Sequence, residues 1–226
     1  MNVIESARSK PRKSRVNQWQ AVFNTLQSGI ISGKFRSGVR LIEDDIIEQT
    51  GATRHAARKA FDELERLGLV IRYPNRGVQV RHFTAREVRE IYEVRECLEL
   101  KAVEGYTEPA TKKFINILND ISEKHEKAVE KNDLGEMFRL NNIFHETVYG
   151  KSKNKILLSA IKHHSLLAHL IQTNAVQSKE MREAGLRDHE AIVKAIEVGD
   201  QKALAGALLR HLTRFRDYYL QTSFSE

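Results

Sequence analysis

Residues 41–81 read LIEDDIIEQTGATRHAARKAFDELERLGLVIRYPNRGVQVR, and this stretch decides the fold. Acidic residues open a short helix pattern that stops at Gly51, because carboxylates suit the positive end of a helix dipole. A second, longer helix pattern follows and stops before Gly68. The apolar residues then alternate, which predicts a β-hairpin with Pro74-Asn75-Arg76-Gly77 at its tip. Helix, turn, helix and hairpin in this order predict a winged helix-turn-helix, a fold suited to the DNA major groove.

The second helix of this stretch carries a basic face. Thr53 is a suitable N-cap, and Arg54 and Arg58 are four residues apart, so they share one face with His55 beside them. A basic face on a surface helix is usually only solvated. Here the basic residues fill the N-terminal half and acidic residues follow, which is typical of a recognition helix whose first residues enter the groove. Arg76, at the hairpin tip, is placed to lie along a minor groove.

The net charge of +7 is confined to the N-terminal third of the chain. Residues 1–82 hold 15 Lys and Arg against eight Asp and Glu, whereas residues 83–226 hold 22 of each kind. This asymmetry indicates a polyanionic partner for the N-terminal third. Residues 1–15 are basic without apolar periodicity. They fit either a solvated, disordered tail or an arm that contacts phosphates.

The composition limits the class of protein. The chain is 41% hydrophobic and 30% charged, as in water-soluble globular proteins. No apolar run reaches the length of a membrane span, and the N-terminus lacks the apolar segment of a secretory signal. Cys97 is the single cysteine, so no intrachain disulfide can form. We therefore expect a cytoplasmic protein with no membrane partner.

Residues 83–226 predict an all-helical domain, so that the whole chain is mainly α. One proline interrupts this part, and no strand-like alternation persists. No repeat is evident, which favours an antiparallel bundle over a solenoid. The expected helices are 84–107, 109–131, 133–149, 153–176, 179–198 and 200–221.

Polar side chains fall on the apolar stripes of these helices. Asn141 and His145 lie on the third, His164 on the fourth, His189 on the fifth and His211 on the last. A single histidine on such a stripe is usually a core residue. Several that converge on one interior need partners, and binding of neutral imidazoles to a divalent metal would provide them.

Arg95 lies on the apolar stripe of the first of these helices. It is four residues from Glu99, so the pair can form an ion pair along the helix. Alternatively, a buried guanidinium can bind the carboxylate of an effector with two hydrogen bonds. The pattern leaves both interpretations open.

The N-terminal third resembles the GntR family of bacterial transcription regulators. The resemblance implies that Arg54 and Arg58 contact DNA, with Thr53, His55 and the wing residue Gly77 close by. Two departures concern base preference: Asp44 stands where some members have Arg, and His55-Ala56 replaces a common Thr-Pro. The matching motifs are Leu41-x-Glu43, Thr53-Arg54-His55-Ala56-Ala57-Arg58-Lys59-Ala60-Phe61, Leu64-Glu65-x-x-Gly68-Leu69-Val70 and Pro74-Asn75-Arg76-Gly77-Val78-x-Val80.

The C-terminal part resembles the FCD ligand-binding domain of the FadR-type branch of this family. The resemblance implies a divalent metal such as zinc, held by Asn141, His145, His189 and His211, with Asn141 in place of the commoner Asp. It also implies a small organic acid as effector, which we place at Arg95 and, less directly, His164. The matching motifs are Glu93-Val94-Arg95-x-x-Leu98-Glu99, Phe144-His145, Ser152-x-Asn154, His189-x-x-Ile192-x-x-Ala195-Ile196-x-x-Gly199-Asp200 and His211-Leu212.

These patterns together predict a metabolite-controlled repressor that binds a two-fold DNA operator as a homodimer. The expected parts are a basic arm at 1–15, a winged helix-turn-helix domain at 16–82, and an effector-binding and dimerisation domain at 83–226. We expect no enzyme. One rival is a metal-dependent hydrolase, since three histidines can activate a water, but no general base or nucleophile motif is present. Another is an architectural DNA-binding protein without an effector, which leaves the polar interior unexplained.

Overall fold

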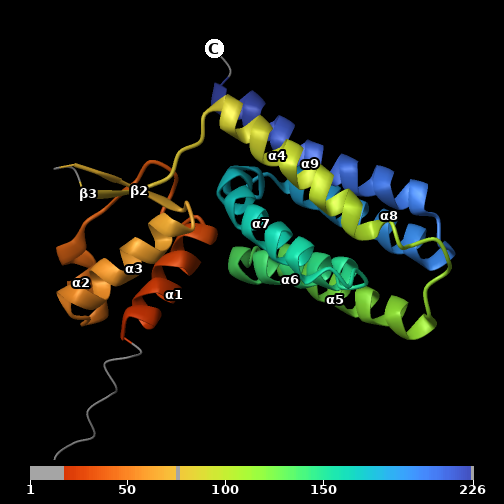
Figure 1. The fold of residues 1–226 in the computed structure, drawn as a ribbon, viewed down its shortest axis with the longest axis horizontal. Helices are drawn as coiled ribbons and strands as arrows, with labels where there is room; N and C mark the ends of the chain where they lie inside the picture. The colour runs from red at the N-terminus through yellow and green to blue at the C-terminus, as the bar shows by residue number, and fades with distance from the viewer. Residues whose placement is uncertain (1–17, 75–76, 225–226) are drawn as a thin grey trace, which may run out of the picture.

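The computed structural model describes residues 18–74 and 77–224 as two units, one carrying the three strands and one all-helical (Figure 1). The fold is mainly α, as the sequence predicts. The first unit contains α1 (Gln18–Ile31), β1 (Arg40–Leu41), α2 (Glu43–Thr50), α3 (Arg54–Arg66), β2 (Val70–Tyr73) and β3 (Gly77–Val80). The second contains α4 (Ala85–Val103), α5 (Lys112–Glu130), α6 (Leu134–Tyr149), α7 (Lys155–Ala175), α8 (Lys179–Val198) and α9 (Gln201–Phe224).

The first unit is a winged helix-turn-helix. Helices α1 and α2 pack on α3, whose apolar stripe is buried, and the strands form an antiparallel sheet in the order β1-β3-β2. Gly51 ends α2 in the left-handed conformation, and the Thr53 hydroxyl caps α3 by accepting from the Ala56 amide at 3.2 Å. Both local expectations are confirmed. The basic arm at 1–15 and the apolar Val16 lie outside the described residues.

One element of this unit was not expected from the sequence. Arg40 and Leu41 form β1, which pairs with β3 through Arg40 opposite Gln79 and Leu41 opposite Val78. A two-residue strand has no local periodicity, and its partner lies nearly forty residues away. The pairing matters for function because it brings Arg40 to the wing.

The six expected helices of the second unit are present, with small differences in their bounds. The largest difference is in the first, which was expected at 84–107 but ends at Val103. Its start is set by Thr84, whose hydroxyl accepts from the Glu87 amide while the Glu87 carboxylate accepts from the Thr84 amide. Among the described residues, no helix is both long and apolar enough to cross a membrane.

The helical bundle buries a core that is unusually polar at one place. Helix α4 packs on α7 and α9, α8 packs on α5 and α9, and α5 packs on α6. The apolar core includes Phe144, Ile192 and Leu208, all fully buried. Next to it lies a set of buried polar side chains drawn from five helices: Arg95, Glu99, His125, His169, Gln172, Asp188, His189 and His211.

Helix α7 joins the two units. It packs against α1 of the winged helix, and one apolar cluster contains Leu26 of α1 together with Ile171 of α7. Helix α7 faces the winged helix in Figure 1. Residues 81–84 connect β3 to α4, and in this connection the Arg81 guanidinium donates to Glu87 at 2.8 Å. Helix α6 also contacts α1, so these two helices of the bundle pack against the winged helix.

Candidate nucleic-acid interface and candidate metal centre

The recognition helix α3 presents its arginines to solvent. The side chains of Arg54 and Arg58 are 65% and 59% exposed, and His55 is exposed beside them. Lys59 instead turns back over the Trp19 ring, 4.4 Å from its centroid. The structure thus brings Thr53, Arg54, His55 and Arg58 to the N-terminal end of one helix, as the sequence suggested.

A groove of about 370 Å³ lies between this helix end and the wing. Arg54, Arg58 and Gly77 line it, as do Arg40 of β1 and Arg72 of β2, which sequence reasoning missed. Gly77 has φ +77°, a backbone conformation that other residues rarely adopt, and Arg40 Nε would lie 3.4 Å from an added Cβ, so this arginine lies against the start of the wing strand. Arg76 lies outside the described residues, and its role stays a prediction. The basic groove matches the position in which a winged helix meets DNA.

Three of the four expected metal ligands meet in the bundle. His145, His189 and His211 each offer a ring nitrogen, and these nitrogens all lie within 4.8 Å of one another. The Nε2 atoms of His145 and His211 are 3.2 Å apart. The ring of His189 stacks on Phe144 at 4.1 Å between centroids, which holds it in place. Helices α6, α8 and α9 thus each supply one imidazole to a single point.

The donor atoms of this cluster fit a metal cation. His189 is 1% exposed, and neither of its ring nitrogens has a hydrogen-bond partner among the described residues. Burial, together with the neighbouring imidazoles, holds the pKa values of His145 and His189 well below their usual range. Neutral imidazoles with free lone pairs in a buried site need a partner, and a divalent cation supplies one.

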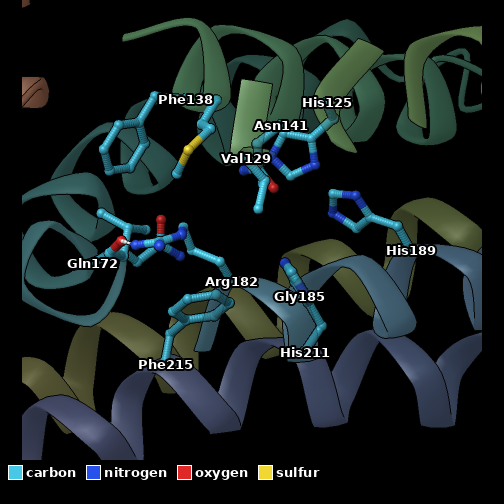
Figure 2. Close-up of a pocket in the computed structure, with 12 residues that line it drawn as sticks. His125, Val129, Phe138, Asn141, Gln172, Arg182, Gly185, His189, His211 and Phe215 are labelled. Atoms are coloured by element: carbon cyan, nitrogen blue, oxygen red, sulfur yellow. Dashed lines mark hydrogen bonds between the residues drawn. The ribbon is translucent and has the colours of Figure 1, made fainter. Parts of the chain in front are cut away.

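Asn141 lies in the same place, together with a histidine that was not expected. Figure 2 shows His189 and His211 on one side of a small cavity, with Asn141 and His125 approaching from the other. His125 of α5 is buried, its Nδ1 has no partner among the described residues, and burial lowers its pKa to about 4. The cavity encloses about 40 Å³, which is room for an ion and a water but not for an organic acid.

A carboxylate lies behind the cluster. Asp188 is buried and accepts from Arg214 Nε at 3.0 Å and Nη2 at 3.1 Å, while its Oδ2 lies 3.6 Å from His211 Nδ1. This separation is too long for a hydrogen bond, and His211 Nδ1 has no hydrogen-bond partner among the described residues, so Asp188 acts on His211 through its charge. The arrangement leaves His211 Nε2 facing His145.

Arg95 is buried and forms the ion pair with Glu99 that was one of the two interpretations of its position. Its Nε donates to Glu99 at 2.8 Å, and the Tyr149 hydroxyl also donates to Glu99. Burial beside this carboxylate raises the pKa of Tyr149 well above its usual range, so the phenol keeps its proton. Arg95 Nη1 is buried without a hydrogen-bond partner among the described residues, and Arg95 lines a small cavity together with His145 and Asn141. Arg95 therefore keeps one free donor beside the histidine cluster.

A larger cavity of about 520 Å³ adjoins this one. The two share His145, Tyr149 and His169, and the larger one is also lined by Lys162 of α7 and Gln27 of α1. Its size suits a small organic molecule. His164, expected near the effector, is not among the side chains that line either cavity, whereas His169, five residues later, lines both.

The comparisons with known proteins agree with this geometry. Residues 18–80 match the model described as bacterial regulatory proteins, gntR family, and residues 90–214 match the FCD domain. The chain belongs to the GntR family. A relative in Bacillus subtilis, the uncharacterized HTH-type transcriptional regulator YdhC, is 30% identical over 190 residues, which cover 84% of this chain and 85% of the relative. This GntR regulator therefore has a DNA-binding domain followed by a ligand-binding domain.

One further relative and one solved structure are similar to this GntR protein over most of its length. The gluconate operon transcriptional repressor of Bacillus licheniformis is 25% identical over 200 residues, covering 86% of this chain and 82% of that one. The crystal structure of a putative GntR transcriptional regulator from Rhodococcus sp. RHA1 has a TM-score of 0.79 at 24% identity and covers 93% of this chain and all of that one. The solved structure supports the fold across both units. The protein is a DNA-binding transcription regulator.

Proposed function

We propose that this GntR regulator is a metabolite-controlled repressor that acts in the cytoplasm as a homodimer on a two-fold operator. One observation carries the proposal: a buried cluster of histidines with free donor atoms lies beside a cavity that is also lined by the DNA-binding unit. A C-terminal domain that only held two DNA-binding domains together would not need polar groups without hydrogen-bond partners in its core. The repressor relative in Bacillus licheniformis supports the direction of control.

Within this proposal, His145, His189 and His211 hold a divalent cation, zinc or a similar ion, with Asn141 beside them. When bound, the cation would supply positive charge and an open coordination position for an anion. Asp188 places a negative charge 3.6 Å from His211 Nδ1, and the Phe144 ring stacks on His189. A neutral amide at 141 adds no charge to the site, so the ion would keep more of its positive charge for a carboxylate effector.

The effector we propose is a small organic acid that enters the larger cavity. It would reach the cation past His145, and Arg95, whose Nη1 has no partner among the described residues, lines the adjoining cavity. Because Glu99 neutralises Arg95, the cation would provide the net attraction for the acid, and Arg95 would provide direction.

The effector would act on DNA binding through α7 and α1. Gln27 of α1 and Lys162 of α7 line the same cavity, so an occupant touches both units. An effector changes DNA affinity only when it binds two arrangements of the protein with different affinity. Contact with α1 in one arrangement and not in another would supply that difference.

The proposal is tested with the purified protein loaded with zinc. DNA fragments that the protein retains from its own genome are sequenced, and a panel of small organic acids is screened for release of the recovered operator. We expect at least one acid to weaken operator binding by tenfold or more, while a Gln27→Ala variant binds the acid but releases DNA less. If no acid in a broad panel changes operator binding, the control by metabolite is wrong.

The two rivals receive less support. A hydrolase receives no support from the relatives, which are described as transcription regulators, and no carboxylate lines the small cavity among the described residues. An architectural protein leaves the buried, unpartnered nitrogens of His189 without a purpose.

A further inference from the structure

Two carboxylates lie against the arginines of the recognition helix. Asp44 and Glu43 stand in the first turn of α2, next to the N-terminal half of α3. Asp44 Oδ1 accepts from Arg54 Nη2 at 2.9 Å. Glu43 accepts from Arg58 Nε at 3.0 Å, and its Oε1 lies 3.8 Å from Arg54 Nη1. The two side chains expected to contact DNA are therefore both paired within the protein.

The Asp44–Arg54 ion pair contributes little to the stability of the fold. Asp44 and Arg54 are 71% and 65% exposed, and exposed pairs contribute little to stability because water and salt screen them. Asp45, the next residue, is also exposed and also lies in the first turn, where its charge serves the helix dipole equally well. The position of Asp44 thus calls for an explanation other than folding.

The carboxylates lie on the surface that approaches DNA. Asp44 and Glu43 line the groove between α3 and the wing, together with Arg54 and Arg58. Arg40 lines it too, and it pairs with no carboxylate in the part of the chain that the structure describes. DNA phosphates are attracted by the arginines and repelled by the carboxylates. Every duplex, whatever its sequence, meets this repulsion.

We propose that Asp44 is a specificity-determining residue, with Glu43 as its partner. Asp44 takes one nitrogen of Arg54 and fixes the direction of the guanidinium, which leaves the other nitrogens to donate to a base edge. A guanine offers two acceptors to one guanidinium, so only a duplex with the right base at this point gains from the fixed direction. The repulsion lowers binding to all DNA, and the orientation restores it for the operator.

The experiment compares Asp44→Ala with Asp45→Ala, which removes the same charge from the same helical turn without touching Arg54. Two duplexes are used, one selected from a random pool by the wild-type protein and one scrambled to the same composition. Fluorescence anisotropy at two salt concentrations measures both affinities. We expect Asp44→Ala to tighten the scrambled duplex by about three- to tenfold and leave the selected duplex no tighter, so that discrimination falls. Asp45→Ala should change both duplexes by the same factor.

A third variant separates charge from orientation. Asp44→Asn keeps an acceptor for Arg54 but loses the charge, so it should tighten both duplexes and retain most of the discrimination. If Asp44→Ala lowers the thermal midpoint of unfolding, the comparison of Asp44→Asn with the wild type still tests the proposal. The proposal is overturned if Asp44→Ala discriminates as well as Asp45→Ala does, or if Asp44→Asn discriminates as poorly as Asp44→Ala.

Discussion

His169 makes the stability of this regulator depend on pH in a way that can be calculated. Its side chain is buried, packs edge-on against Phe138 with 5.4 Å between ring centroids, and has no partner for Nδ1 among the described residues. Burial, with a smaller contribution from the charge of Arg95, lowers its pKa from 6.5 to about 3. The folded protein therefore keeps this imidazole neutral at pH values where the unfolded chain binds a proton.

The sign and size follow from these two pKa values. Above pH 6.5 both states are neutral at His169 and the residue has no effect on pH dependence. As the pH falls below 6.5 the unfolded state gains the proton and the folded state does not, so stability is lost down to about pH 3. At pH 5 the unfolded chain is 1.5 pH units below its pKa, and the loss is about 2 kcal/mol.

The assay is urea unfolding of chelator-treated protein at pH 7.5 and pH 5. Between these conditions a His169→Phe variant should lose about 2 kcal/mol less stability than the wild type, since Phe cannot bind a proton. The matched control is His163→Phe, an exposed position on the same helix, which should follow the wild type. An equal loss in the wild type and His169→Phe would show that His169 titrates normally, and the reasoning would be wrong.

Three further predictions concern the backbone, the DNA contact and the metal. Gly199 has φ +74°, and a Cβ added there would lie 2.4 Å from the Glu108 carbonyl carbon. Gly199→Ala should therefore lower the free energy of unfolding in urea by about 2–5 kcal/mol. Gly105→Ala, with open space around the added Cβ, should lower it by less than about 1 kcal/mol. Arg58→Ala should weaken the selected operator by about tenfold or more and a scrambled duplex by clearly less, as measured by anisotropy; equal losses would remove Arg58 from base contact. His189→Ala should lose most of the bound metal in elemental analysis, and wild-type metal content would exclude His189 as a ligand.

Local periodicity predicted most of the fold because the decisive signals lie close together in the sequence. The Thr53 cap, the turn at Gly51 and the stripe of α3 each depend on neighbours within one helical turn. The strand β1 could not be predicted in this way. Its two residues become a strand only through pairing with β3.

The histidine cluster was partly predictable for the same reason. His145, His189 and His211 fall on apolar stripes, and the bundle brings them together. His125 also follows Ile121 by one turn, so its stripe carried the signal that was overlooked. His169 was missed in favour of His164 because α7 buries several consecutive positions from 167 to 173, and periodicity does not separate them.

The inward face of α4 shows a different limit. The fully buried positions include Tyr92 and Glu99, whereas the apolar Ile91 and Leu98, each one residue earlier, are only partly buried. Prediction of buried positions from apolar periodicity does not select a carboxylate such as Glu99. Glu99 is buried because Arg95 and Tyr149 both donate to it, which is a tertiary arrangement that no local pattern contains.

The most direct test of the central claim is operator affinity with and without the releasing acid, in the wild type and in His189→Ala, each supplied with zinc. We predict that the acid weakens wild-type binding by tenfold or more, while His189→Ala binds the operator with wild-type affinity and ignores the acid. A variant that still releases the operator at the same acid concentration would contradict the account, because control would then not pass through the histidine cluster.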